Sequence, residues 1–386
     1  MGFSMLFLSF LEQCRQKSNF DKQSEEFREV VFYSEGSADW PHLGPVIKEL
    51  LKAGQKVSYL SSEKDDIAFD LDHENFKCFF IGNGAIRTLL FFSIKAKIFI
   101  MTLPDLETYH LKKSKYAVHY IYIYHSINST HMVYREHAFD AYDTIFCVGD
   151  HHKKEIRETE KVYGLPEKNL VNHGYGKLDD LIQKTRRKKT SLFGKKILLA
   201  PSWGTCSIIE NNFSFEIIKL ILESSYDLTV RLHPMTVRHH PKLKSQLEND
   251  FKEYRNFKIE SNMNNNSSLY EADVLITDWS GISCEYAFVT KKPVLFLDTP
   301  KKINNSNYKK IKRKCLEDEI RFEIGEVLRM DQIEDIPKTI ERLISQKNFF
   351  QKKIEKAQDS YIYNLGESAK VASLEILKIR KLLSEC

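Results

Sequence analysis

Residues Tyr270–Pro300 read YEADVLITDWSGISCEYAFVTKKPVLFLDTP, and this stretch decides the fold. Its run Val274–Ile276 is short, apolar and rich in strand-forming residues, which is typical of a buried parallel strand. The polar turn Thr277–Gly281 follows, and Ile282–Val289 then places apolar residues at helical spacing. A second apolar run begins at Val294. Strand, turn, helix and strand within one short stretch predict a βαβ unit.

The turn of this unit suits an anion. The turn after the first strand of a βαβ unit lies at the carboxyl edge of the sheet, where the next helix points its free N–H groups. We therefore predict that Ser280, Gly281, Ile282 and Ser283 cradle a phosphate with backbone amides and hydroxyls. A second interpretation stays open, in which Asp278 and Ser280 only cap the helix.

Size and composition indicate a globular protein that handles anions. The 386 residues suggest two domains of about 150–200 residues each. The chain is 42% hydrophobic and 29% charged, which is ordinary for a globular protein. Its net charge of +5 comes from basic clusters rather than one stripe. This favours anionic substrates or an anionic membrane surface, and no nucleic-acid partner is expected because the basic runs lack interleaved aromatic residues.

The cysteines and the N-terminal segment indicate in which cellular compartment the protein is expected. Seven cysteines lie far apart without a CxxC motif, so neither a disulfide framework nor a zinc site is predicted. No apolar run approaches the roughly 20 residues of a membrane span. Met1–Leu11 is apolar but lacks a basic region, so it is either an interfacial anchor or a helix packed on the core, with Gln13–Glu26 as a polar continuation. We expect a cytoplasmic protein, with a peripheral place on the inner face of the cytoplasmic membrane as an open alternative.

The first half of the chain predicts a Rossmann-like domain over residues 29–185, after an N-terminal helical segment at 1–28. Strand Glu29–Tyr33, helix Leu43–Ala53 and strand Lys56–Leu60 open this domain. The GxGxxG motif is absent, so no dinucleotide cofactor is expected, and no other cofactor or metal is predicted.

A histidine leaves a strand of this half. Tyr116–Tyr124 is an apolar and aromatic run that predicts a buried strand, and His125 follows at its carboxyl end. Catalytic groups of α/β folds collect at that edge, and a histidine with a pKa near 6.5 can act as a general base. The alternative is a loop histidine without a chemical task. Further on, His173 and Gly174 open a turn that either faces the cleft or is a simple turn.

The second half repeats the alternation over residues 186–360. Gln183–Lys196 is strongly basic and predicts a solvated linker between the domains, with a role at an anionic membrane face left open. Strand Asp227–Leu232 then places Arg231 and His233 on one face, as a clamp for a pyrophosphate or as a plain solvated edge. Lys301–Lys314 is predicted to be a basic loop. Two helices follow, and a last helix is expected at 361–386, with a return to the N-terminal domain as an open alternative.

The order of these parts describes a GT-B architecture, an α/β fold in which two Rossmann-like domains face each other across a cleft. Glu271–Pro300 resembles the motif of the CDP-glycerol glycerophosphotransferase family, the teichoic-acid primases and polymerases. Four further segments are similar to motifs of that family in the same order: YHSI (Tyr124–Ile127), HGYGKLDDL (His173–Leu181), LLAPSW (Leu198–Trp203) and RLHP (Arg231–Pro234). The resemblance covers roughly Tyr116 to Ala372.

The resemblance implies a role for each matched residue. It makes His125 the general base on the acceptor hydroxyl and His233 the second catalytic histidine, which contacts donor phosphate, so that the two face one another across the cleft. The remaining assignments are donor phosphate for Arg231, Asp278, Ser280, Gly281 and Ser283, and donor nucleotide for His173, Gly174, Ser202 and Trp203. Gly281 stands where the family has a second serine, so it keeps an amide donor but lacks a hydroxyl.

The implied activity is transfer of glycerol phosphate, or a related polyol phosphate, from a CDP donor to a hydroxyl of a cell-surface polymer or its lipid-linked precursor, with release of CMP. Two alternatives stay open. One is a GT-B glycosyltransferase that uses a nucleotide sugar in capsule or lipopolysaccharide synthesis. The other is a nucleotide-binding or glycan-binding protein without catalysis.

Overall fold

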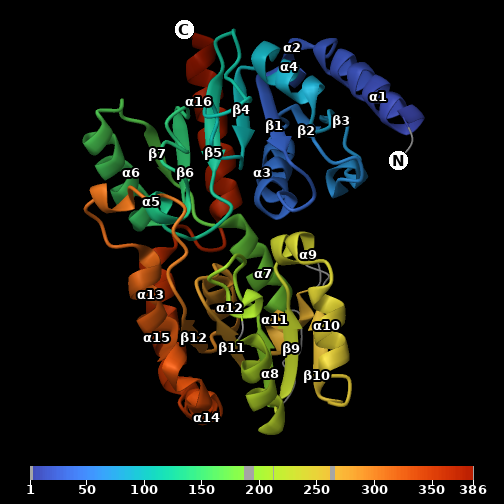
Figure 1. Ribbon diagram of the computed structural model, residues 1–386. Coiled ribbons are helices and arrows are strands. Elements are labelled where there is room, and N and C mark those ends of the chain that lie inside the picture. Colours follow the sequence, from blue (N-terminus) through green and yellow to red (C-terminus); the bar gives the residue numbers. More distant parts are fainter. Residues whose placement is uncertain (1–2, 187–194, 212, 261–265, 386) are drawn as a thin grey trace. The chain divides into compact units, whose positions relative to one another are not determined.

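The computed structural model describes residues 3–186, 195–211, 213–260 and 266–385 (Figure 1). These residues form two compact units, each built on one sheet of parallel strands. The first unit comprises Met1–Asp180, Asn305–Arg313 and Ile362–Cys386, and the second comprises Leu181–Asn304 and Lys314–Tyr361. The two α/β units with parallel sheets agree with the GT-B fold class predicted from the sequence.

The first unit holds a seven-stranded sheet in the order β3-β2-β1-β4-β5-β6-β7. Every pair of neighbours is parallel. The strands are β1 (Val30–Ser34), β2 (Val57–Ser61), β3 (Phe76–Phe80), β4 (Ile98–Met101), β5 (His119–Ile123), β6 (Thr144–Cys147) and β7 (Asn169–Asn172). Because the order reverses between β1 and β4, the loops after β1, β4 and β5 emerge around the position where open α/β sheets bind ligands.

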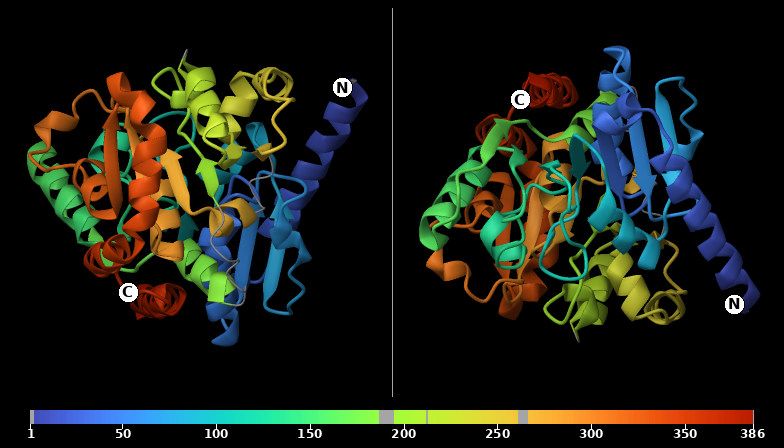
Figure 2. Two further views of the ribbon diagram at one scale, coloured as in Figure 1. Left: turned by 90° about the horizontal axis from the view of Figure 1, so that it is seen from below. Right: turned by 90° about the horizontal axis from the view of Figure 1, so that it is seen from above.

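Helices cover both faces of this sheet (Figures 1 and 2). Successive residues of a strand point to opposite faces, so Phe32 joins the core under α3 and α16, whereas the ring of Tyr33 packs 4.9 Å from that of Phe91 in α4. The helices are α1 (Phe3–Asp21), α2 (Glu25–Glu29), α3 (Trp40–Lys52), α4 (Ala85–Ser93), α5 (Thr130–Val133), α6 (Asp150–Tyr163) and α16 (Ser368–Glu385). Helix α7 (Gly176–Arg186) begins in this unit, and its residues from Leu181 on belong to the second unit.

The chain termini both belong to the first unit. The last helix, α16, packs against α3 and buries Ala372, Ile376 and Ile379 in the core. At the other end, α1 packs on β3 and α4, and Phe20 is buried with its ring 5.6 Å from that of Phe79. The predicted polar continuation, Gln13–Glu26, extends α1 as far as Asp21, and the short α2 begins at Glu25.

The second unit holds a six-stranded parallel sheet in the order β10-β9-β8-β11-β12-β13. Its strands are β8 (Lys196–Leu199), β9 (Asp227–Arg231), β10 (Phe257–Glu260), β11 (Val274–Thr277), β12 (Val294–Asp298) and β13 (Gly325–Arg329). Its helices are α8 (Ser214–Glu223), α9 (Pro234–His239), α10 (Leu243–Asp250), α11 (Ser267–Glu271), α12 (Ile282–Thr290), α13 (Leu316–Ile324), α14 (Ile336–Ser345) and α15 (Lys347–Tyr361). The βαβ unit of the deciding stretch is β11-α12-β12, with every residue of β11 buried.

Two segments differ from the sequence prediction, and most of a third lies outside the described residues. The strand predicted at Tyr116–Tyr124 is confined to β5, because Tyr116 is exposed and precedes it. The predicted basic loop folds partly onto the first unit, where Asn305 donates a hydrogen bond to the carbonyl of His131 and Ile311 is buried. Most of the predicted basic linker, residues 187–194, lies outside the described residues. No helix among the described residues combines the length and apolar character that crossing a bilayer requires.

Candidate active site

The serine turn lies between β11 and α12 in the second unit. Gly281 has a helical backbone (φ −62°, ψ −14°) and stands just before the first residue of α12. Ser283 donates to the carbonyl of Ser280 twice, through its amide (3.2 Å) and its hydroxyl (2.9 Å). The Ser283 hydroxyl is therefore engaged within the turn, whereas Ser280 and Gly281 remain partly exposed at the N-terminus of the helix. Such a terminus favours an anion.

Asp278 anchors a neighbouring loop. Its side chain is buried, and its two oxygens accept hydrogen bonds from the amides of Ser202 (2.7 Å) and Ile208 (3.1 Å). Burial raises the pKa of this carboxyl group, and the two backbone hydrogen bonds oppose the effect. A carboxylate so engaged repels a phosphate instead of binding it. These contacts favour a positioning role in which Asp278 joins the loop after β8 to the turn after β11, and its assignment to donor phosphate stays a prediction.

The loop after β8 brings an aromatic ring to His233. The ring centroid of Trp203 lies 6.1 Å from that of His233. Ser202, in the same loop, is buried, and its amide donates a hydrogen bond to Asp278. The Nδ1 atom of His233 accepts the amide of Met235 (3.1 Å) and so caps α9. Burial, helped by the charge of Lys302, lowers the pKa of His233 to about 4. The ring is neutral near pH 7 with its proton on Nε2, because Nδ1 is an acceptor, and Nε2–H can donate to a phosphate oxygen.

Arg231 is committed to partners within the second unit. Its guanidinium lies 3.9 Å from the carboxylate of Glu260 and donates to the side-chain oxygen of Asn266 (3.2 Å). Burial lowers the pKa of Arg231, which is still charged. Its charge is partly balanced by Glu260, so it contributes less to a pyrophosphate clamp with His233 than the spacing in β9 predicted.

Two cations that the sequence analysis did not single out lie beside the tryptophans of these loops. The ammonium of Lys302 is 3.9 Å from the ring centroid of Trp203, and burial lowers the pKa of Lys302 to about 8. The guanidinium of Arg321 stacks 4.1 Å from the ring of Trp279 and donates to Asp298 (2.9 Å). The Nε and Nη2 atoms of Arg321 have no hydrogen-bond partner among the described residues. The basic run around Lys302 was a signal for the first cation, whereas α13, which carries Arg321, was not predicted.

His125 follows β5 in the first unit. Its Nδ1 lies 3.2 Å from the hydroxyl of Tyr122, and the hydroxyl of Tyr175 donates to its backbone carbonyl (3.0 Å). Burial lowers the pKa of His125, and the charge of Asp39 and a hydrogen bond with the backbone of Thr102 oppose the effect. The imidazole is thus held neutral near pH 7, which is the form a general base requires.

Helix α6 braces the loop after His125. The ring nitrogens Nε2 of His151 and His152 lie 2.9 Å from the backbone carbonyls of Ile127 and Asn128 respectively. The buried carboxylate of Glu155 accepts the amide of Thr130 (2.6 Å) and its hydroxyl (2.8 Å). The adjacent histidines therefore fix the backbone of the loop after His125, a role that the sequence alone did not reveal.

His173 and Gly174 lie in the interior of the first unit. The ring of His173 is buried with its centroid 5.4 Å from that of Phe146, and burial lowers its pKa to about 4. Gly174 has φ +103°, and a Cβ there would meet the carbonyl oxygen of Tyr363 at 2.3 Å. A ring and a backbone enclosed in this way have no face left for a nucleotide. This enclosure favours the simple structural turn, and the assignment of both residues to the donor nucleotide stays a prediction.

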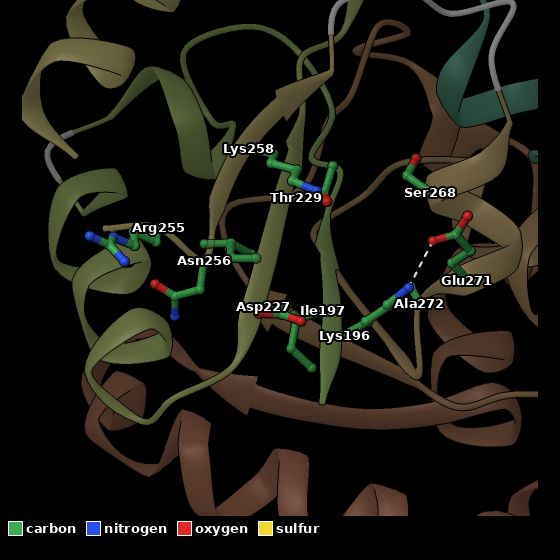
Figure 3. Close-up of a pocket in the computed structure, with 11 residues that line it drawn as sticks. Lys196, Ile197, Asp227, Thr229, Arg255, Asn256, Lys258, Ser268, Glu271 and Ala272 are labelled. Carbon is green, nitrogen blue, oxygen red and sulfur yellow. Dashed lines mark hydrogen bonds and ion pairs between the residues drawn. The ribbon is translucent and has the colours of Figure 1, made fainter. Parts of the chain in front are cut away.

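A cavity in the second unit lies away from these loops (Figure 3). It has a volume of about 150 Å³ and is lined by the first residues of β8 and β9, among them Lys196 and Asp227, and by Arg255, Asn256 and Glu271. These residues mark the amino ends of the strands. Open α/β sheets bind their ligands at the carboxyl ends, so we do not assign the donor to this cavity.

His125 belongs to the first unit and His233 to the second. That they face one another stays a prediction. The comparisons with known proteins bear on the whole chain. Residues 92–372 match the family model described as CDP-Glycerol:Poly(glycerophosphate) glycerophosphotransferase. No curated protein matches the sequence.

Several solved structures share the fold. One is the wall teichoic acid polymerase TagF, in a crystal soaked with CDPG, at 15% identity and a TM-score of 0.62, covering 98% of this chain and 99% of that one. Two others are a putative UDP-N-acetylglucosamine 2-epimerase from Listeria monocytogenes (14% identity, TM-score 0.57, 93% and 97% coverage) and the UDP-N-acetylglucosamine 2-epimerase from Rickettsia bellii (14%, 0.56, 93% and 96%). At these identities the similarity shows the GT-B fold alone.

The role of Asp278 is testable by Asp278→Asn. The amide group of asparagine offers one acceptor oxygen, so Ser202 or Ile208 would face an NH₂ donor. We expect a loss of about 1–3 kcal/mol in the free energy of unfolding, measured by urea denaturation. The control is Asp227→Asn, an exposed residue at the opposite edge of the sheet, which should change stability by no more than about 0.5 kcal/mol. Equal effects of the two substitutions would contradict the positioning role.

Proposed function

Because the chain belongs to the CDP-glycerol:poly(glycerophosphate) glycerophosphotransferase family, we propose that the loops of its second unit bind the phosphates of a CDP-glycerol donor and that His125 activates the acceptor. The acceptor is a hydroxyl of a cell-surface polymer or of its lipid-linked precursor. One observation carries the proposal. The neutral ring of His233 presents an Nε2–H donor in the same unit as the open N-terminus of α12.

Donor binding rests on charge and on N–H groups. A pyrophosphate needs hydrogen-bond donors and positive charge at its oxygens. The amides at Ser280 and Gly281 and the Nε2–H group of His233 supply hydrogen-bond donors. Lys302 supplies positive charge where it lies over Trp203. The exposed part of the Trp203 ring is left to pack against the nucleotide, and Arg231 adds a more distant charge.

The chemical step follows from these groups. The acceptor oxygen attacks the β-phosphorus of the donor while its proton passes to the neutral imidazole of His125. The bond between the β-phosphorus and the bridging oxygen breaks, and CMP leaves with the electron pair. Charge on the transferred phosphoryl group and on CMP is stabilised by His233 and the serine turn. Phosphoryl transfer of this kind depends mainly on positioning and electrostatics.

Substitution of each histidine tests the two roles. We expect CMP release from CDP-glycerol to fall about 10²–10⁴-fold in His125→Ala, because a general base is lost. His233→Ala should fall by about 10²–10³-fold, because one donor to the transition state is lost. The control is His137→Asn, an exposed histidine whose φ of 68° suits asparagine, and it should keep full activity. Turnover that survives both alanine substitutions, or release of a nucleoside diphosphate from nucleotide sugars instead of CMP, would overturn the proposal.

The pH dependence tests the state of His125. Burial lowers its pKa below the usual value of about 6.5, so the neutral base persists in mildly acidic solution and the acid limb of kcat/KM should lie below pH 6.5. Asp39→Asn removes a charge that raises the pKa of His125, so the limb should move to still lower pH. His233, with a pKa of about 4, titrates below this range. An acid limb above pH 6.5, or one that rises in Asp39→Asn, would refute the assignment of the base.

We also propose a peripheral membrane location through the first unit. Leu8, Leu11, Leu89 and Phe92 are exposed on α1 and α4, which pack against each other. Next to them, the ammonium groups of Lys95 and Lys115 lie 4.9 Å and 5.3 Å from the ring of the exposed Tyr116. Apolar side chains bordered by lysines suit the interface of an anionic bilayer.

Vesicle binding tests this location. Phe92→Ser should weaken co-sedimentation with vesicles that contain phosphatidylglycerol by about tenfold, because burial of one aromatic side chain is lost. Phe349→Ser removes an equally exposed ring from α15 of the second unit and should leave binding unchanged. Equal binding by wild-type protein to neutral and anionic vesicles, or equal effects of the two substitutions, would contradict the proposal.

A further inference from the structure

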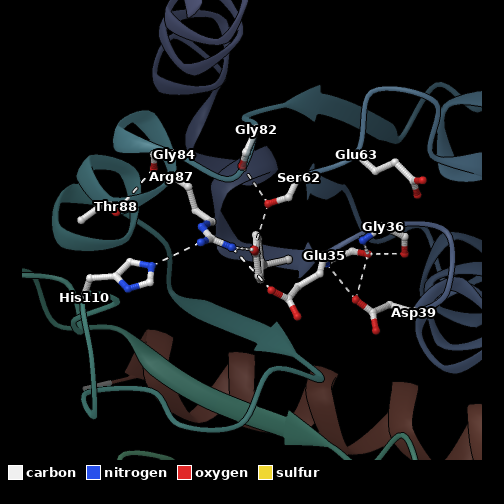
Figure 4. Close-up of polar contacts among 12 residues, drawn as sticks. Glu35, Gly36, Asp39, Ser62, Glu63, Gly82, Gly84, Arg87, Thr88 and His110 are labelled. Carbon is white, nitrogen blue, oxygen red and sulfur yellow. Dashed lines mark hydrogen bonds and ion pairs between the residues drawn. The ribbon is translucent and has the colours of Figure 1, made fainter. Parts of the chain in front are cut away.

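A second polar cluster of the first unit surrounds Arg87, near the carboxyl ends of β1, β2 and β3 (Figure 4). The Nη1 atom of Arg87 donates to the hydroxyl of Tyr33 (3.2 Å), and Nη2 lies 3.3 Å from Nε2 of His110. The nearest carboxylate is that of Glu35, 3.5 Å from Nη1. These four residues come from β1, the loop after it, α4 and the loop between β4 and β5, and we name them the Arg87 cluster.

The guanidinium at the centre is poorly matched. Arg87 is only 8% exposed, and its Nε has no hydrogen-bond partner among the described residues. A buried arginine is usually held by a carboxylate in a short, two-pronged contact. Here the contact with Glu35 is single and long, and the side chain of Glu35 is 58% exposed. The site therefore contains a buried positive charge whose only close anion among the described residues stands at the rim.

The backbone beside Arg87 also favours an anion. Helix α4 follows the turn Gly82–Gly84 and has no side-chain cap at its start. Arg87 stands in the first turn of this helix, where amides lack acceptors within the helix. Gly82 has φ +61°, a conformation that glycine adopts without strain. Its carbonyl accepts the hydroxyl of Ser62, which in turn lies 2.9 Å from the hydroxyl of Tyr33. The turn and the arginine are thus held in one network.

The cluster is connected to the loop of His125. Asp39 accepts the hydroxyl of Thr102 (2.9 Å) with one oxygen and the amide of Glu35 (2.8 Å) with the other. Strands β1, β4 and β5 are consecutive neighbours in the sheet. Neighbouring strands lie about 4.8 Å apart, so the loops after β1 and β5 leave the sheet roughly 10 Å from each other. A single extended acceptor can reach both.

We propose that the Arg87 cluster binds a phosphodiester group of the acceptor chain while the terminal hydroxyl of that chain lies at His125. The inference rests on the proposed function, since the family description gives the acceptor class as poly(glycerophosphate), a polymer that carries a phosphate in every repeat. Apart from His110, the cluster precedes residue 92, where the family match begins. The phosphate displaces Glu35 from Arg87 and takes its place. Arg87, Tyr33 and the first amides of α4 then hold the phosphate oxygens.

Because the phosphate displaces Glu35, the proposal predicts the direction in which ligand affinity changes when Glu35 is substituted. An arginine with only a structural role predicts no such increase in affinity. Glu35→Gln removes a competing carboxylate and should tighten binding of a phosphate ligand. If the cluster instead binds hydroxyl groups, or if Glu35 only balances Arg87, the same substitution weakens binding or leaves it unchanged. Arg87→Lys keeps the charge and loses the planar fork, so it should weaken binding.

The experiment is calorimetric titration of the full chain with a short poly(glycerol phosphate) oligomer, with inorganic phosphate and glycerol as separate probes. We expect Glu35→Gln to lower the Kd of the oligomer by about threefold and Arg87→Lys to raise it by about tenfold, since each tenfold step corresponds to loss of one good charged contact. Lys48→Gln on α3 is exposed and serves as the control with unchanged Kd. Glycerol should not bind, and phosphate should bind weakly with the same response to both variants.

Two outcomes overturn the inference. One is an oligomer that does not bind wild-type protein, and the other is a Kd that rises or stays constant in Glu35→Gln. If Arg87→Lys fails to fold, as its thermal unfolding would show, the sign of the change in Glu35→Gln still decides, because that residue is exposed. The proposed function is judged separately by CMP release. If CMP release is normal and the oligomer Kd is the same in both variants as in wild-type protein, only the phosphate site is refuted. If the oligomer binds but no CMP is released, the transferase function is refuted.

Discussion

In both sheets each pair of hydrogen-bonded strands in the described residues is parallel, and the rest of the structure depends on this constraint. Parallel strands deliver the loops that follow them to one edge of the sheet. His125, Arg87 and Glu35 are therefore gathered in the first unit from segments far apart in the sequence. In the second unit the same rule gathers Ser280, Trp203 and His233. Function can then be varied through these loops while the apolar strands stay unchanged.

Burial gives the gathered groups their chemistry. Removal from water lowers the pKa of His125 and His233, so both rings stay neutral at pH 7, one able to accept a proton and the other to donate a hydrogen bond. Asp278 is also removed from water, and its buried side chain is satisfied by hydrogen bonds from two backbone amides. Arg87 and Arg321 show the opposite case, since each keeps a buried nitrogen that has no hydrogen-bond partner in the described part of the chain. A buried nitrogen without a hydrogen bond lowers stability, and a bound anion would supply the missing acceptor.

Local patterns explain how much could be predicted. The βαβ unit from β11 to β12 and the strands ahead of His125 and His233 were predicted because apolar runs and polar turns report on their own segment. The burial of Asp278, His173 and Gly174 was not predicted, because a motif does not say whether a side chain faces a ligand or the interior. Lys302, Arg321 and the Arg87 cluster were missed, since their importance comes from neighbours far away in the sequence.

The sequence by itself determined the α/β class, the alternation of strands and helices in both halves and the family to which the chain belongs, because strand and helix periods and turn residues act over a few positions. Only the tertiary structure decided that Asp278 ties two loops together, that residues 305–313 return to the first unit and that α16 covers α3. The physical reason is that burial and pairing of side chains are set by long-range packing. No window of sequence contains both partners of such a contact.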